Sequence, residues 1–350
     1  MEVFNSSSRN RETYHIAVQS SLLWETALGI AAITNTALRD TLEKPMNEWE
    51  AIRKSMSQGM KQHLDTVQQH NTWKALLELL HQSHLLTLAD FTHYIQQLTE
   101  EDLKFNCLPF MGKKKTGARM AAARGDLAAV KDLQELTAGH AFLTDYIEYI
   151  ATADPAWLKK HLIEVMTGWY EQVIAPEADH LEAILSRDHQ SKAVAKEKMH
   201  PEELVSWATG GIEYTPEPSV SRVLLIPHLT YRPWNVEADL EDTKVFYYPV
   251  ANESMNPEDP YMPDQFLVQK CKALGDENRL RILKILGEKE RTLKELTTLL
   301  SMRKSTVHHH VKQLKAARFV KQNGAIYQVA SHQLASLGHE LQGYAGGHYE

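Results

Sequence analysis

The feature that most constrains this chain is a pair of short helical segments joined by only three residues and followed by a hairpin pattern. Thr292 opens the first segment, and Glu295 three residues later completes a capping box. The connection Ser301-Met302-Arg303 leads into the second segment, 304–317, and so tight a turn forces the two helices to cross steeply. Strand-like runs at 319–322 and 325–329 then flank Asn323-Gly324, a strong signal for a tight hairpin turn. The sequence therefore predicts a helix-turn-helix with a short wing.

Further helices are predicted on both sides of this motif, in the order helix, helix, helix, helix, hairpin, helix from Phe266 onward. Gly275 is expected to close the first in a left-handed conformation, and Asp276 to cap the second. The expected core residues of the second and third helices are Leu280, Leu283, Ile285, Leu286, Leu293, Leu296, Leu299 and Leu300.

The faces of the segment 304–317 have different chemistry. Val307, Val311 and Leu314 fall at i, i+4 and i+7 and should pack inward. The other faces carry hydroxyls and imidazoles, which can bond base edges in a major groove, and cations, which can contact phosphates. An ordinary solvated amphipathic helix is the alternative, but the following wing favours DNA binding. The predicted DNA-binding residues are Arg303, Lys304, Ser305, Thr306, His308, His309, Lys312, Lys315, Lys321 and Asn323.

Charge is distributed unevenly along the 350 residues. The formal net charge is −7, yet residues 264–350 hold 14 Lys and Arg against 8 Asp and Glu, which leaves 24 against 37 for residues 1–263. A basic module attached to an acidic body is expected when one end of a chain contacts nucleic-acid phosphates and the rest of the chain has a different role.

The fold class we predict is mainly α with small β elements. Residues 13–215 are expected to be mostly helical, including 14–39, 73–80 and 158–173, with a basic, solvated loop at 113–117. Two β-branched and aromatic runs, 220–226 and 243–248, predict strands of a small sheet closed by Pro227 and Pro249. We therefore place a helical domain at 1–255 that ends in a short sheet at about 220–250, a linker at 256–264, and a winged helix-turn-helix at 265–350.

Residues 264–330 resemble the winged-helix domain of the ArsR type of bacterial repressor. The resemblance rests on the run from Ala273 to Leu283, on the run from Ser305 to Leu314, and on Phe319-Val320. Less closely, residues 10–250 resemble an uncharacterised helical domain found upstream of such winged helices. The resemblance implies a homodimer, an operator with inverted half-sites, and repression relieved by an inducer. Many metal-sensing relatives carry a cysteine pair in the helix before the recognition helix; residues 292–300 have none, which excludes soft-metal sensing at that place.

Other functional classes find little support. Cys107 and Cys271 are the only cysteines, so a disulfide framework is not expected. His308-His309-His310 point in different directions around a helix and should not converge on a metal, and we expect His310 to pack within its domain. Asp179-His180 and Asp188-His189 are expected on a solvated face. Most of the seven tryptophans are expected in the core rather than around a ligand.

No phosphate loop or nucleophile elbow accompanies these residues, so no cofactor and no enzymatic activity are expected. The polar N-terminus, 1–11, lacks the pattern of an export signal, and no segment is apolar enough to span a membrane, so we expect a cytoplasmic protein.

The leading hypothesis is a homodimeric regulator that binds a double-stranded DNA operator, whose acidic body supplies dimerisation, effector binding or both. One alternative is an enzyme or small-molecule-binding protein with an appended DNA-binding module. Another is an interaction scaffold whose winged helix binds protein. The expected dimer segments are 265–273, with Phe266, Leu267 and Val268, and 333–341, with Leu334, Leu337 and Leu341.

Overall fold

The computed structural model describes residues 13–83, 85–140 and 142–346, so the polar N-terminal stretch lies outside the described residues. The chain divides into two compact units. Unit 1 comprises the chain up to Pro201 together with Thr215–Pro249, and unit 2 comprises Glu202–Tyr214 with the chain from Val250 onward. The mainly helical fold class with small β elements is confirmed. No helix of the described chain is long and apolar enough to cross a membrane.

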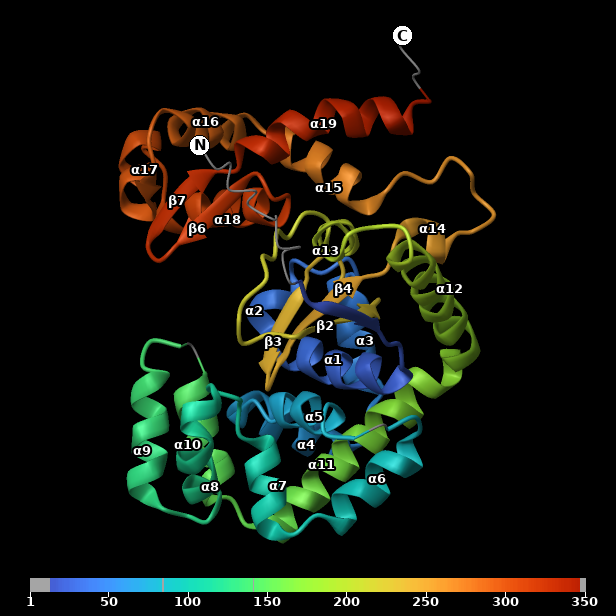
Figure 1. Ribbon diagram of the computed structural model, residues 1–350, viewed down its shortest axis with the longest axis vertical. Helices are drawn as coiled ribbons and strands as arrows, with labels where there is room; N and C mark the ends of the chain where they lie inside the picture. Colours follow the sequence, from blue (N-terminus) through green and yellow to red (C-terminus); the bar gives the residue numbers. More distant parts are fainter. Residues whose placement is uncertain (1–12, 84, 141, 347–350) are drawn as a thin grey trace, which may run out of the picture. The chain divides into compact units, whose positions relative to one another are not determined.

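Unit 1 is a helical assembly that includes one small sheet (Figure 1). Its elements are β1 (His15–Val18), α1 (Leu22–Thr34), α2 (Thr36–Arg39), α3 (Met46–Ser55), α4 (Gln58–His70), α5 (Trp73–Leu80), α6 (Leu88–Gln97), α7 (Glu100–Cys107), η1 (Lys113–Lys115), α8 (Thr116–Ala123), α9 (Leu127–Leu136), α10 (Leu143–Thr152), α11 (Pro155–Trp169), the π-helical turn η2 (Tyr170–Ile174), η3 (Ala175–Glu177), α12 (Ala178–Lys196), β2 (Arg222–His228), β3 (Val236–Leu240) and β4 (Thr243–Pro249).

The sheet has the order β1-β2-β4-β3, with β1, β2 and β4 parallel and β3 antiparallel at one edge. The two predicted strands are confirmed, but Pro227 does not close β2. β1 pairs with β2 only as far as Leu225, and beyond that point β2 pairs with β4 alone. The missing N–H of Pro227 therefore interrupts no second ladder, as is usual for proline in a sheet.

The helix predicted at 14–39 is wrong at its beginning. His15–Val18 is the strand β1, and α1 starts at Leu22 with Ser21 as its N-cap. A short apolar run is ambiguous between a buried strand and a helix when only its own residues are considered. Here the free edge of β2, more than two hundred residues later in the sequence, decides the outcome.

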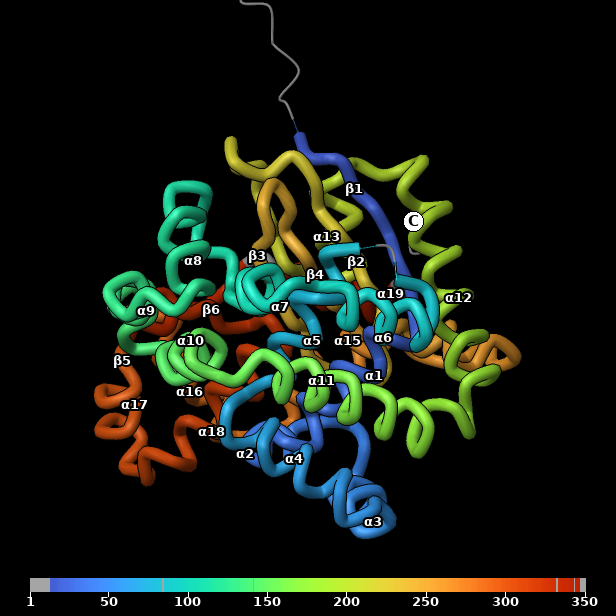
Figure 2. Tube along the Cα trace, turned by 90° about the horizontal axis from the view of Figure 1, so that it is seen from below, coloured from blue at the N-terminus to red at the C-terminus, as the bar shows by residue number. Residues whose placement is uncertain are grey.

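Helix α1 is the centre of unit 1, because all residues from Leu23 to Thr34 are buried. It packs on α4, α5 and α11, and Figure 2 shows the long α11 running past α7, α5 and α1. Successive side chains of the sheet point to opposite faces. On one face Leu224, Ile226, Val245 and Tyr247 join the core around α1. On the other face Tyr248 donates to Asp188 Oδ2 of α12 over 2.8 Å.

One surface prediction for unit 1 is wrong, and a second is confirmed only in part. The basic stretch 113–117 is largely exposed, as expected, but it is a 3-10 turn that leads directly into α8 rather than a loop. Asp188 lies in the interior rather than on a solvated face, with Lys192 Nζ at 3.6 Å. At Asp188 a partner distant in sequence, Tyr248, thus stabilises a charge that local patterning assigns to solvent.

Unit 2 holds the predicted helix-turn-helix (Figure 1). Its elements are α13 (Pro201–Thr209), α14 (Asn252–Met255), α15 (Gln265–Leu274), α16 (Glu277–Glu288), β5 (Arg291–Thr292), α17 (Leu293–Leu300), α18 (Lys304–Ala316), β6 (Val320–Asn323), β7 (Ile326–Val329) and α19 (Ser331–Tyr344).

We predict that Gly29→Ala destabilises the protein although alanine favours helices. A Cβ at Gly29 would lie 2.5 Å from Trp169 Nε1, and this tryptophan is fully buried and cannot retreat. Overpacking of this kind costs about 1–3 kcal/mol of unfolding free energy. The matched control is Gly59→Ala on the exposed side of α4, where a Cβ meets no described atom within 4 Å and where a gain of up to about 1 kcal/mol is expected. Urea unfolding measures both, and equal effects of the two variants would contradict the steric argument.

Candidate nucleic-acid interface

The second helix of the motif, α18, is held by a continuous apolar core. Val307, Val311 and Leu314 are at most 1% exposed, as predicted, and they join a cluster with Leu296 and Leu300 of α17 and Ile282 of α16. The prediction that Leu280 and Leu299 lie in the core is wrong, because their side chains are 50% and 52% exposed. Each lies about 60° around its helix from the nearest buried residue, since three residues turn by about 300°.

Local hydrogen bonds fix where the helices begin and end. The predicted capping box is confirmed: Glu295 N–H donates to Thr292 Oγ1 over 3.3 Å, and Thr292 N–H donates to Glu295 Oε2 over 2.7 Å. Asp276 caps α16 as predicted, accepting from Arg279 N–H, but Gly275 has φ −76° and is not left-handed. The left-handed residue is Ser301, with φ 55°, in the turn between α17 and α18.

The predicted base-reading residues share the exposed side of α18. Ser305, Thr306, His308 and His309 are all exposed, and so are Arg303 and Lys304 at the start of the helix. The N-cap residue, Arg303, makes no side-chain capping bond within the described chain. The N–H groups of the first turn of α18 therefore remain available to an anion such as a phosphate.

The third histidine, His310, packs within the unit, as expected from the direction of the helix face. It is 9% exposed, and its Nδ1 lies 3.7 Å from Asp276 Oδ1. His308 and His309 remain at the surface. Among the described residues no group of three His, Cys, Asp or Glu side chains could hold a metal ion.

Two predicted phosphate contacts have partners inside unit 2. Lys315 Nζ donates to Gln322 Oε1 over 2.6 Å, and burial lowers the pKa of Lys315. Lys321 Nζ lies 3.1 Å from Glu213 Oε2, with both side chains about half exposed. Lys312 is half buried. The exposed cations at the N-terminus of α18 are therefore more accessible than those toward its C-terminus.

The wing is a three-stranded sheet with the order β5-β7-β6. Asn323 is the last residue of β6 and pairs with Ile326, so the two turn residues are Gly324 and Ala325 rather than the predicted Asn323 and Gly324. Gly324 supplies the positive φ, 57°, that this turn requires. The strand β5 was not predicted, because two residues carry no periodic signal. Asn323 is exposed near the tip.

An additional segment, Glu202–Tyr214, belongs to unit 2 and contacts α15, the turn that follows α18 and the wing. Gly210, with φ 69°, leaves room for the Phe266 ring, since a Cβ there would lie 2.2 Å from it. The carbonyl of Thr209 accepts from Arg318 Nη2 over 3.3 Å, and Glu213 pairs with Lys321 of the wing. The sequence analysis missed these contacts, because nothing local links 202–214 to a motif more than fifty residues away.

A family model described as a helix-turn-helix domain matches residues 274–323. The match runs from the end of α15 through α16, α17 and α18 to the end of β6, and so it covers the two helices and the turn described above. No curated protein and no solved structure matches the chain. Unit 2 therefore contains a helix-turn-helix domain, a type of module in which the second helix lies in the DNA major groove.

We predict that Glu213→Gln strengthens DNA binding by the chain. The substitution removes a negative charge beside the wing and frees Lys321 for a phosphate. A half-exposed pair of this kind is worth about 0.5–1 kcal/mol, which corresponds to a gain of a few-fold in affinity. Fluorescence anisotropy with duplex DNA at fixed salt measures the change.

Glu258→Gln is the charge-matched control, since Glu258 is exposed in the acidic linker. Weaker binding by Glu213→Gln, or an equal gain in the control, would show that the Glu213–Lys321 pair does not limit contact with DNA.

Proposed function

We propose that this chain is a sequence-specific DNA-binding transcriptional regulator that acts as a repressor of the ArsR type. One observation carries the proposal: α18, the second helix of the helix-turn-helix, exposes Ser305, Thr306, His308 and His309 while its apolar stripe is buried. Hydroxyls and imidazoles can donate to and accept from base edges, whereas a helix that served only to fold the domain needs no such set.

In this proposal the exposed side chains divide the work. The hydroxyls and imidazoles of α18 contact bases. Arg303 and Lys304, with the uncapped N–H groups of the first turn, bind phosphates and set the register on the duplex. Lys312, Lys315, Lys321 and Asn323 add contacts on the side of the wing, where Lys315 and Lys321 must first exchange their protein partners for phosphates.

We predict that hydroxyl and cation variants of α18 fail in different ways. Ser305→Ala or Thr306→Ala should cost about 1–3 kcal/mol on a specific operator and little on random DNA. Lys304→Gln should weaken binding to both and reduce the slope of log affinity against log salt by about 1. The operator is first selected from a random duplex library, and affinities are then measured across a salt series.

Thr152→Ala is the matched control, because Thr152 is an exposed threonine of α10 in unit 1. Equal losses on operator and random DNA for the hydroxyl variants would mean that they do not read bases. A salt slope near zero for the unmodified chain would count against DNA binding altogether.

The repressor and effector parts of the proposal rest on the resemblance of residues 264–330 to ArsR-type winged helices. α17 carries no cysteine, so we propose an effector other than a soft metal, bound by the helical unit 1.

We further propose a homodimer, because one α18 and one short wing cover about half of a typical site. The candidate helices α15 and α19 pack on each other, with Lys270 Nζ 2.6 Å from Glu340 Oε1. Most of the apolar residues expected at the dimer contact cover their own unit: Leu267 is 5% exposed, and Leu334 and Leu337 pack on its core. The apolar surface that these helices leave free includes Leu341 and Tyr344, which are 42% and 51% exposed.

We predict that Leu341→Glu weakens self-association, because it places a charge in the apolar end of α19. The full chain should sediment as a dimer at micromolar concentration, and the variant should shift toward monomer by at least tenfold in dissociation constant, since burying an unpaired carboxylate costs well over 1.4 kcal/mol. Leu136→Glu in α9, where the leucine is 53% exposed, is the control. A monomeric full chain would refute the dimer, and a dimer untouched by Leu341→Glu would move the contact elsewhere.

The enzymatic alternative has one observation in its favour, a Ser20 Oγ that lies 3.2 Å from His189 Nδ1. A serine nucleophile needs a base that is itself oriented by a third group. Among the described residues no side chain is within hydrogen-bond distance of the other ring nitrogen of His189. We therefore propose a non-enzymatic role for the chain.

A further inference from the structure

Unit 1 contains a cavity of about 750 Å³, a size typical of small-molecule sites. Its walls come from the connection between β1 and α1, the end of α5 with the segment that follows, α7, α8, and the β3–β4 end of the sheet. Elements separated by more than two hundred residues thus surround one space. The apolar wall includes Trp24, Leu80, Phe105, Phe110 and Leu224, and the exposed Leu86 lies at the rim.

The charges around this cavity do not cancel. The lining includes two carboxylates, and each has a lysine nearby: Lys74 Nζ lies 2.7 Å from Glu78 Oε1, and Lys113 Nζ lies 3.6 Å from Glu241 Oε1 and 2.8 Å from Asp242 Oδ1. The lining also includes Arg119 and Arg222, and within the described chain neither guanidinium has a carboxylate within 4 Å. Four cations thus stand against three carboxylates, so the surroundings of the cavity are net positive, and Arg119 and Arg222 are the two cations without a direct ion pair in the described chain.

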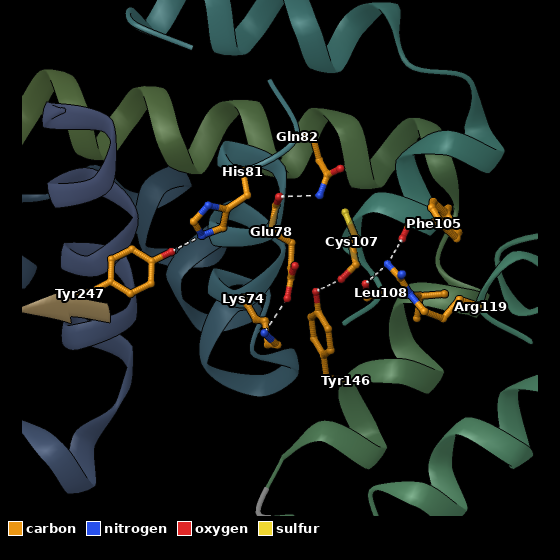
Figure 3. A network of polar contacts seen from close by, with 10 residues as sticks. All are labelled: Lys74, Glu78, His81, Gln82, Phe105, Cys107, Leu108, Arg119, Tyr146 and Tyr247. Carbon is orange, nitrogen blue, oxygen red and sulfur yellow. Dashed lines mark hydrogen bonds and ion pairs between the residues drawn. The ribbon is translucent and has the colours of Figure 1, made fainter. Parts of the chain in front are cut away.

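Arg119 is the more unusual of the two, because it is 7% exposed. Its Nη2 donates to the carbonyls of Phe105 and Leu108 over 3.1 and 2.8 Å, and its guanidinium stacks on the Phe105 ring at 4.5 Å (Figure 3). Nε is buried with no hydrogen-bond partner among the described residues. A buried cation without a direct counter-ion is costly, and an anion bound beside it would offset part of that cost.

Burial lowers the pKa of Arg119, and the more distant carboxylates of Glu78 and Glu241 offset only part of that effect.

The neutral groups of the cavity suit an anion with a flat apolar body. His81 Nε2 lies 2.6 Å from the Tyr247 hydroxyl (Figure 3). The centroids of the His81 and Trp24 rings are 4.6 Å apart. Burial, with the nearby charges of Lys74 and Arg222, lowers the pKa of His81 to about 3. The ring is therefore neutral at physiological pH and adds aromatic surface beside Trp24.

We infer that this cavity binds a small organic anion, a carboxylate carried on an aromatic or similarly flat apolar body. The carboxylate bonds to Arg119 and Arg222, whose planar donors match it in a bidentate manner. The apolar body packs against the wall of Trp24, Phe105 and Phe110. The last step alone rests on the proposed function: the bound anion is the effector of the regulator.

The test uses the full chain and a panel of paired probes: benzoate, 2-naphthoate and indole-3-acetate, each beside its uncharged amide. Isothermal titration should show one site per chain, with at least one carboxylate binding at least tenfold more tightly than its amide. Arg119→Gln and Arg222→Gln should each weaken that carboxylate by about tenfold or more and leave the amide nearly unchanged, as expected for a charge-assisted hydrogen bond.

Arg124→Gln is the matched control, since Arg124 ends the same helix at the surface and pairs there with Glu101 at 2.8 Å. Arg222 is exposed, so its variant keeps the test valid even where Arg119→Gln unfolds the unit. Failure of the whole panel to bind at millimolar concentration, equal binding of acids and amides, or equal losses in all three arginine variants would each overturn the anion site.

The effector role is tested separately by measuring operator affinity with and without the anion that binds. The expected result is a change of at least fivefold that disappears in Arg222→Gln. An unchanged affinity overturns the effector role. A chain that binds the anion but no DNA would instead refute the proposed function and leave the anion site standing.

Discussion

The burial of one stripe on α18 is the interaction on which the candidate function depends. Val307, Val311 and Leu314 pack into the core shared with α16 and α17, and this packing fixes the rotation of the helix about its own axis. The rotation decides which side chains face outward, so the hydroxyls and imidazoles of the N-terminal half owe their exposure to three aliphatic residues. The core therefore orients the interface as well as stabilising the domain.

Acidic side chains have different roles in the two units. In unit 1 the carboxylates of Glu78 and Asp188 are buried beside lysines, where removal of one partner leaves a desolvated charge. In unit 2 Glu213 is half exposed and holds Lys321 of the wing only weakly. The acidic side chains of the two units thus include fixed partners of interior lysines and one surface partner that a polyanion can replace.

The sequence predicts the helix-turn-helix well, because its signals are local. The capping box at Thr292, the spacing of Val307, Val311 and Leu314, and the glycine of the wing act within a few residues of one another. The errors arise where a distant partner decides. His15–Val18 is a strand because it pairs with the edge of β2. Asp188 is buried because its carboxylate accepts a hydrogen bond from Tyr248 and lies beside Lys192 Nζ. The contacts of 202–214 with the winged helix have the same origin, and no periodicity reports them.

Unit 2 is discontinuous in sequence, and the chain passes between the two units three times, at 201/202, 214/215 and 249/250. A single proteolytic cut in the acidic linker therefore cannot release an intact DNA-binding module. The C-terminal product would lack α13, and the Phe266 ring that lies against Gly210 would face water. In evolutionary terms, recombination at a single breakpoint in the linker would not transfer the whole of unit 2, since Glu202–Tyr214 is encoded before the strands β2, β3 and β4 of unit 1.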